Sequence, residues 1–382
     1  MRFDLLIENV DVVSPGDPLR RCHGVGVRGE TIAAVAPMNE FHDVVAAERI
    51  DGRGGLCTPG FVNVHNHTPL MGVRGMVEDL GFAPAYTKGI PQGHWFGDEE
   101  TYALSKLGLA ELLRQGCTTV VDFYARPAAL ARAMCETGLR GFVGGRIMDV
   151  DTAALADGRF EIDPALGEAT FQDNLDLIAD WDGKGEGRVA CVWGPHAPDT
   201  CSPDLMRRVA ELSAADGRLV HTHLAQSPME VERLAAVYGQ TPVEYFDDVG
   251  LLNGRLTAAH CIRLTDADIQ RLGASGAHVA HVPVGNATGG QLAPIEALAK
   301  SGANIALATD SKSGDMLEAM RTAIAVARLR AEGRFVFDAE TAFAWGVAGG
   351  ASALGLGGRV GKIQAGMLAD IVLFDHAAPN LR

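Results

Sequence analysis

Residues 60–67, Gly-Phe-Val-Asn-Val-His-Asn-His, form a short apolar run that ends in two histidines separated by one residue. A short apolar run bounded by turn residues predicts a buried strand. Beyond this stretch the chain alternates similar runs with amphipathic segments of helical period, which is typical of parallel strands joined by crossover helices. The stretch is therefore expected to be the first strand of an α/β domain.

The same pattern recurs along the chain. The expected strands are 60–67, 117–124, 140–150, 188–196, 218–225, 256–262, 278–284 and 304–310. Helix start signals lie between them, such as Ser202 before Pro203 and Thr265 before Asp266. Eight such units predict a TIM (β/α)8 barrel, and a doubly wound open sheet is the alternative fold. In a TIM barrel the functional groups gather where the strands end.

The two ends of the chain read differently. Residues 1–57 and 359–382 carry short β-like runs, at 4–8, 24–28, 31–36 and 369–374, separated by Gly, Pro and Asp. We expect these ends to meet in a small β-sandwich-like domain, with the barrel of residues 58–358 inserted between them.

Composition excludes several classes of function. Against 48 Asp and Glu there are 33 Lys and Arg, a formal net charge of -15, so a nucleic-acid-binding surface is not expected. The N-terminus meets an acid before any apolar run long enough for a signal peptide, and no segment approaches the roughly 18 apolar residues of a membrane span. The seven cysteines include no C-x-x-C pair, which disfavours a disulfide framework or a cysteine zinc site. A cytoplasmic protein that acts on a small molecule, without nucleic-acid or membrane partners, is expected.

Polar groups gather at the ends of the expected strands. His65 and His67 lie two residues apart, so both imidazoles point to the same side of the first strand. The other strand-end residues of this kind are His221, His223, His260 and Asp310. Core packing explains one such residue more easily than the whole set. Imidazoles with one carboxylate suit Zn²⁺, although Fe²⁺ or Mn²⁺ accept the same ligands. A catalytic divalent metal site with an open position for water is therefore expected.

Seven motifs spread over nearly the whole chain carry a family resemblance. They are TPGFVNVHNH at 58–67, VRG at 73–75, GPHAP at 194–198, HTHL at 221–224, AAHC at 258–261, ATD at 308–310 and GMLAD at 366–370. In these motifs the chain resembles the amidohydrolase superfamily, and within it the branch of S-adenosylhomocysteine and methylthioadenosine deaminases, guanine deaminase and triazine hydrolases. The resemblance implies metal-dependent hydrolysis of a carbon–nitrogen bond in a small, planar nitrogen heterocycle, with deamination as the leading reaction.

The resemblance also implies roles for individual residues. It gives one metal ion held by His65, His67, His223 and Asp310, and no bridging carbamylated lysine, because the fourth strand has no Lys. It makes Asp310 the acceptor of a proton from the attacking water, and His260 the group that stabilises developing negative charge. The substrate contacts that it implies are His196, Arg146 and Asn286. A salt bridge from Arg146 to Asp149 or Asp151 is the alternative to a carboxylate clamp.

One departure from the family concerns Gln226. Deaminases of this branch have a glutamate three residues after the fifth-strand metal histidine, which delivers a proton to the substrate ring, and an amide cannot do so. Three explanations are open. The substrate needs no proton at this position, another group supplies the proton, or the glutamine is an introduced change. Glu230 and Glu232 are expected to be solvated helix residues. The alternatives to deamination are another leaving group, as in dechlorination or cyclic amide or urea hydrolysis, and a catalytically impaired binding protein.

Two further departures concern the substrate and the assembly. Residues 89–96 lack the carboxylate with which nucleoside deaminases hold ribose, so a ribose substrate is not favoured. Trp95 and its neighbours His94 and Phe96 are expected to form an aromatic wall over a planar ring, or a lid without substrate contact. Members of the branch usually continue beyond the run ADIVLFD at 369–375 to finish the small β domain, whereas this chain ends at Arg382. We therefore expect an exposed β edge that a partner subunit covers, as in a homodimer.

Overall fold

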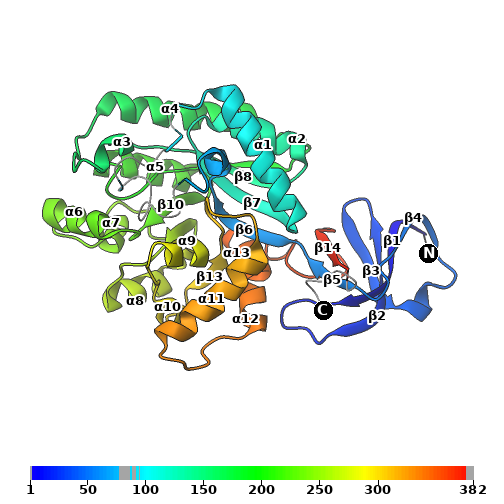
Figure 1. Cartoon of the computed structure of the whole chain (residues 1–382). Coiled ribbons are helices and arrows are strands. Elements are labelled where there is room, and N and C mark those ends of the chain that lie inside the picture. The colour runs from blue at the N-terminus through cyan, green and yellow to red at the C-terminus, as the bar shows by residue number, and fades with distance from the viewer. Residues whose placement is uncertain (1, 77–86, 88–91, 94, 376–382) are drawn as a thin grey trace.

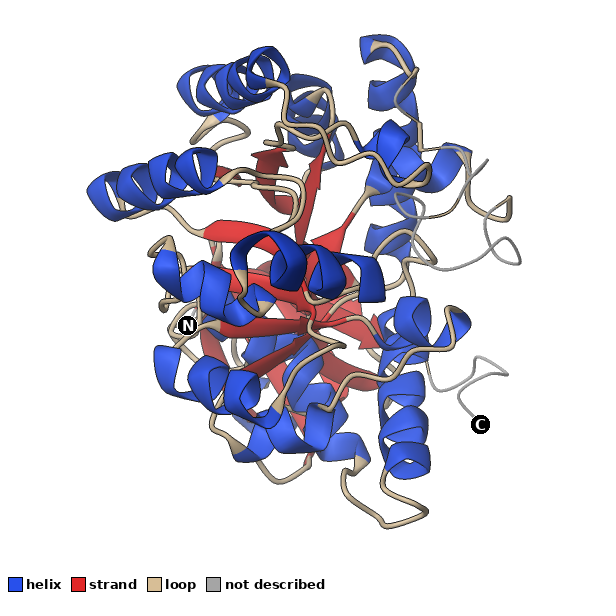
Figure 2. Ribbon diagram, turned by 90° about the vertical axis from the view of Figure 1, so that its left-hand side faces the viewer, coloured by secondary structure: helices blue, strands red, loops and turns tan. Residues whose placement is uncertain are grey.

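The computed structural model describes residues 2–76, 87, 92–93 and 95–375. Figure 1 shows a larger α/β body and, beside it, a small sheet that contains both ends of the chain. Figure 2 shows the strands of the body surrounded by helices. This arrangement agrees with the α/β class that the sequence predicts.

The small sheet contains six strands. They are β1 (Arg2–Val12), β2 (Arg20–Arg28), β3 (Thr31–Pro37), β4 (Val45–Asp51), β5 (Leu56–Pro59) and β14 (Ile371–Phe374). Their order is β14-β5-β1-β2-β3, with β4 also paired to β1. The two ends of the chain meet where β14 runs antiparallel to β5. The described strands form one connected sheet rather than two separate layers, and β5 extends two residues beyond the predicted boundary at residue 57.

All eight expected strands of the body are present, and most are shorter than expected. They are β6 (Phe61–Asn66), β7 (Cys117–Tyr124), β8 (Arg140–Gly145), β9 (Val189–Val192), β10 (Val220–Leu224), β11 (Leu256–His260), β12 (His278–His281) and β13 (Asn304–Leu307). Proline explains part of the shortening at β12, because Pro283 cannot donate a ladder hydrogen bond beyond the strand.

The eight strands form two parallel sheets rather than one continuous sheet. Their orders are β6-β7-β8-β9 and β10-β11-β12-β13. Two isolated parallel bridges join the sheets, Trp193 with Val220 and Asn66 with Asp310. We call these junctions the β9–β10 seam and the β6–β13 seam. Because both seams join strand edges of the two sheets, the strand ends that carry the polar residues are brought to one region.

Helices cover the outside of these sheets. The longer ones are α1 (Asp98–Arg114), α2 (Pro127–Thr137), α4 (Pro164–Trp181), α5 (Pro203–Asp216), α6 (Pro228–Tyr238), α8 (Asp266–Ser275) and α11 (Met316–Arg330). The shorter ones are α3 (Thr152–Leu155), α7 (Pro242–Asp248), α9 (Pro283–Thr288), α10 (Ile295–Lys300), α12 (Ala339–Ala344) and α13 (Gly350–Ala353), with 3₁₀ turns at Met38–Phe41 and Thr68–Gly72 and a π-helical turn at Trp345–Gly349.

Local sequence explains several helix starts. Thr265 caps α8 by accepting the Asp268 backbone N–H, and Ser202 precedes Pro203 at the start of α5, as the sequence predicts.

Among the described residues, no helix combines the length and apolarity that crossing a membrane requires. Five of the seven cysteines are buried, whereas Cys22 is exposed.

Candidate metal centre and active site

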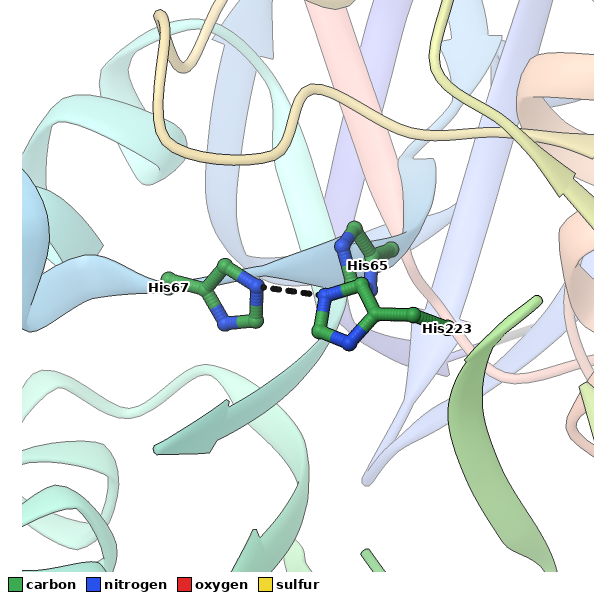
Figure 3. A group of neighbouring side chains, drawn as sticks. All are labelled: His65, His67 and His223. Atoms are coloured by element: carbon green, nitrogen blue, oxygen red, sulfur yellow. Dashed lines mark hydrogen bonds between the residues drawn. The ribbon is translucent and has the colours of Figure 1, made fainter. Parts of the chain in front are cut away.

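Five of the predicted site residues meet at the ends of four strands. His65 lies in β6 with His67 directly after it, His223 lies in β10, His260 ends β11, and Asp310 follows β13 across the β6–β13 seam. One ligating atom each from His65, His67 and His223 lies within 4.8 Å of the others, and the same holds for His65, His260 and Asp310. Figure 3 shows His65, His67 and His223 directed toward one another.

Backbone carbonyls orient two of these imidazoles. The Nδ1 atoms of His67 and His223 lie 2.7 Å from the carbonyl oxygens of Phe123 and His196 respectively. A carbonyl only accepts, so each Nδ1 carries the hydrogen and each Nε2 presents a lone pair. These two Nε2 atoms face each other at 3.3 Å. Two lone pairs at this distance fit a shared cation.

His65 completes the donor set. Its Nε2 is buried and has no hydrogen-bond partner among the described residues, although it lies 4.0 Å from the Asp310 carboxylate. A buried polar atom without a partner is costly unless something absent from the protein chain satisfies it. Three imidazole nitrogens and a carboxylate therefore fit a divalent metal ion.

Burial keeps these imidazoles neutral. It lowers the pKa of His67 to about 4, and it holds the pKa values of His65 and His223 well below the ordinary histidine value. The neighbouring histidines lower the pKa of His65 further, because two positive rings repel each other. Neutral imidazole is the form that binds a metal, so no proton has to be displaced at neutral pH.

Asp310 links the candidate ligands to His260. Its carboxylate oxygens lie 3.8 Å from His67 Nε2 and 4.0 Å from His260 Nε2. The Asp310 backbone is left-handed, with φ of 58°, and its N–H donates to the His65 carbonyl at 3.0 Å. The carboxylate of Asp310 thus lies beside the histidines at a left-handed residue that still pairs with β6.

His260 also has a left-handed backbone, with φ of 74°, and a partner of its own. Its Nδ1 lies 2.9 Å from the Asn286 Oδ1. The amide oxygen accepts, so Nδ1 carries the hydrogen and Nε2 faces Asp310. Asn286, predicted as a substrate contact, is thus placed against His260, and its buried Nδ2 has no partner among the described residues.

His196 and Arg146 form a second polar group beside the histidines. The His196 ring lies 4.8 Å from that of His223, and Arg146 Nη2 lies 3.1 Å from His196 Nε2 and 3.0 Å from Thr152 Oγ1. Asp149 and Asp151 were the predicted alternative partners of Arg146. Their carboxylates accept backbone N–H groups, Asp149 from Ser202 and Asp151 from Ala153. A buried cation therefore lies next to the candidate metal ligands.

The structure describes only part of the predicted aromatic wall. Trp95 is 66% exposed, and its ring contacts Phe96 edge-on at 5.5 Å. His94 and residues 89–91 lie outside the described residues.

Gln226 is buried directly after β10, and its surroundings correct one expectation. Glu230 is fully buried rather than solvated, and its carboxylate accepts the backbone N–H groups of Ala225 and Gln226 at 2.6 and 2.8 Å. Burial, with the nearby Asp199 carboxylate, raises the pKa of Glu230 to about 8. Glu232 is exposed, as predicted. Glu230 lies in the first turn of α6 and reaches back to the left-handed turn at Ala225, so helical periodicity alone could not place it.

A profile of the Amidohydrolase family matches residues 56–381 of the chain. The chain belongs to the amidohydrolase family. The 5-methylthioadenosine/S-adenosylhomocysteine deaminase of Pelotomaculum thermopropionicum is 32% identical over 389 residues, which cover 99% of this chain and 86% of that protein. These findings confirm the resemblance that the sequence predicts.

Solved structures of other amidohydrolases are also similar. An adenosine deaminase from Xanthomonas campestris with bound zinc is 30% identical, with a TM-score of 0.89, over 100% of this chain and 87% of that one. The guanine deaminase of E. coli has a TM-score of 0.85 over 98% of this chain and 90% of that one, and at 22% identity it shows the shared fold alone. The family is metal-dependent, which agrees with the histidine cluster of this chain.

Proposed function

We propose that this chain is a metal-dependent aminohydrolase that removes an amino group from a small nitrogen heterocycle. The observation that carries the proposal is the convergence of His65, His67, His223, His260 and Asp310 at neighbouring strand ends. The deaminase relatives support a hydrolase that acts on carbon–nitrogen bonds.

In this proposal His65, His67, His223 and Asp310 hold one divalent ion. Zn²⁺ is the first candidate, since a similar structure binds zinc, and Fe²⁺ or Mn²⁺ suit the same ligands. When bound, the ion makes a water molecule nucleophilic at neutral pH. Asp310 would accept the proton that this water loses and pass it to the Nε2 lone pair of His260, which faces the carboxylate at 4.0 Å. The imidazolium so formed, held in place by Asn286, would stabilise the negative charge that develops on the substrate.

The substrate is proposed to lie beside His196 and Arg146, where the buried guanidinium favours an anionic or carbonyl-bearing group. Asn286 and Trp95 stay proposed substrate contacts, with Asn286 acting through His260 as well. Gln226 contributes a hydrogen bond rather than a proton.

The proposal also covers the architecture, the location and the assembly of the chain. The two parallel sheets act as one (β/α)8 barrel of residues 58–358, supported by the bridges at both seams. Residues 1–57 and 359–382 form a separate small unit around the terminal sheet. The chain is proposed to work in the cytoplasm as a homodimer, with the edge strand β14 available for pairing with a second subunit.

The test compares the purified protein with its Gln226→Glu variant. Elemental analysis measures bound metal, and a coupled assay measures ammonia release from aminopurines, aminopyrimidines, pterins and triazines. Glu232→Gln is the matched control, because it changes an exposed carboxylate on α6, the helix that follows Gln226.

We expect bound metal and ammonia release from the unmodified protein. Ammonia from the Gln226→Glu variant alone would identify Gln226 as an inactivating residue within the same chemistry. Bound metal without ammonia from either protein would contradict deamination and point to another leaving group or to a binding role. Absence of bound metal from both would contradict the metal site.

A further inference from the structure

His221 lies in contact with one of the candidate ligands. It belongs to β10, two residues before His223, so both side chains point to the same side of that strand. Its Nε2 lies 2.7 Å from His65 Nδ1, and both residues are buried. The edge-on contact of its ring with Phe123, at 4.9 Å between centroids, limits how far the ring can turn.

The short distance between these nitrogens leaves two possible pairs of tautomers. Two ring nitrogens 2.7 Å apart share one hydrogen, so one donates and the other accepts. If His65 Nδ1 donates, His65 Nε2 presents its lone pair beside Asp310. If His221 Nε2 donates instead, His65 Nε2 carries a hydrogen and cannot bind a metal.

The other two imidazoles show which arrangement matches the site. His67 and His223 each direct Nδ1 to a backbone carbonyl, which leaves both Nε2 lone pairs facing the centre. His221 occupies for His65 the place that those carbonyls occupy. It differs from them in one respect that matters for experiment, because a side chain can be replaced and a carbonyl cannot.

We propose that His221 is a positioning residue that accepts the Nδ1–H of His65 and so holds the His65 ring in the metal-binding tautomer and orientation. The inference rests on the proposed function, since it requires the metal site. It links the two parallel sheets, because His65 belongs to the first sheet and His221 to the second. Hydrogen-bond partners of this kind typically change metal affinity about 10- to 100-fold when removed.

The test measures metal affinity by competition with a chromogenic chelator. His221→Phe keeps an aromatic ring and removes the acceptor, whereas His221→Gln keeps an acceptor near the same place. His278→Phe is the matched control, because His278 begins β12, at the end of the strand away from the candidate ligands, and its Nδ1 contacts the Asn304 side chain.

We expect His221→Phe to weaken Zn²⁺ affinity about 10- to 100-fold, with His221→Gln recovering most of the loss and His278→Phe causing none. The absorption spectrum of the Co²⁺-loaded protein should change in His221→Phe alone. Unchanged affinity of folded His221→Phe overturns the inference while leaving the proposed function intact. Lack of metal binding by the unmodified protein contradicts both.

A second measurement does not depend on the folding of a variant. NMR of ¹⁵N-labelled imidazoles in the metal-loaded, unmodified protein, assigned with the His221→Gln spectrum or by contacts to Phe123, reports the tautomer of His221. We expect hydrogen on Nδ1 and an accepting Nε2. Hydrogen on His221 Nε2, with His65 Nδ1 accepting, would reject the inference.

Discussion

The two seams between the parallel sheets are built from different chemistry. At the β6–β13 seam, the side-chain amides of Asn63 and Asn66 both donate to Thr309 Oγ1, at 2.7 and 2.9 Å. At the β9–β10 seam, backbone bonds join Trp193 to Leu219 and His221 to Trp193, at 3.0 and 2.9 Å. The Trp193 ring is buried and stacks on Phe171 at 5.6 Å.

This difference suggests that one seam serves metal binding and the other serves stability. The β6–β13 seam carries three of the four proposed metal ligands, and its polar side chains hold the strand of His65 against that of Asp310. The β9–β10 seam buries a large aromatic side chain, which contributes mainly to stability. Changes at the first seam should therefore alter metal binding more than folding, and changes at the second should do the reverse.

The largest effect is expected from His65→Ala. The roughly 10–16 kcal/mol of a protein zinc site, shared among four ligands, gives about 3 kcal/mol per ligand, or about 10²-fold in affinity. We expect elemental analysis to find little metal after dialysis and turnover to be lost, with a near-native circular dichroism spectrum. A full equivalent of metal in this variant would contradict the ligand assignment.

Trp193→Ala is expected to show the opposite pattern at the β9–β10 seam. Truncating a buried tryptophan typically costs about 3–5 kcal/mol of unfolding free energy. Denaturant titration should show that loss, while the folded fraction keeps its metal affinity. Trp193→Phe is the control, since it keeps a ring against Phe171 and should lose less stability. Equal losses of metal and stability would mean that the two seams do not divide the tasks.

Much of this fold could be predicted because apolar runs reveal buried strands. All eight strands of the body were predicted in place, since each combines an apolar run with flanking turn residues. Strand β4 was not predicted, and its burial explains why: six of its seven residues are exposed, so Val45–Asp51 shows no apolar alternation. The end of β12 was predicted too long because Pro283, which begins α9, cannot donate a ladder hydrogen bond.

The candidate site, like the fold, could be predicted only in part. Strand alternation alone placed His65 and His67 on one face, and the family resemblance supplied the rest of the ligand set. The contacts of His221 with His65 and of Asn286 with His260 could not be predicted, because they depend on how distant strands are aligned. The burial of Glu230 depends on the left-handed turn at Ala225, which a sequence of ordinary residues does not reveal.

The pH dependence of the unfolding free energy tests a buried carboxyl group close to the β6–β13 seam. Asp122 of β7 is buried, accepts the Thr68 hydroxyl and backbone N–H, and has a pKa that burial raises from 3.8 to about 7. Between these values the folded chain keeps a proton that the unfolded chain has lost. The unfolding free energy therefore falls as pH rises from about 4 to about 7, by up to about 1.4 kcal/mol per pH unit from this group.

Asp122→Asn should remove that contribution. Histidine titrations affect both proteins, so the difference between their unfolding free energies isolates Asp122. We expect the variant to gain stability relative to the unmodified protein as pH rises from 4 to 7, and the difference to level off above that range. Parallel stability curves for the two proteins would show that Asp122 is ionised in the fold throughout.

A last prediction concerns Thr309→Val, which removes the hydroxyl oxygen that Asn63 and Asn66 share. Two buried amide donors lose a partner, and an unsatisfied buried polar group costs about 1–3 kcal/mol. Because Thr309 precedes Asp310, the loss should appear in weaker metal affinity as well as in a lower unfolding free energy, unlike the loss caused by Trp193→Ala. Thr309→Ser keeps the oxygen and should retain the affinity. If Thr309→Val lowers stability while metal affinity stays unchanged, the amide contacts hold the seam together without placing the ligands.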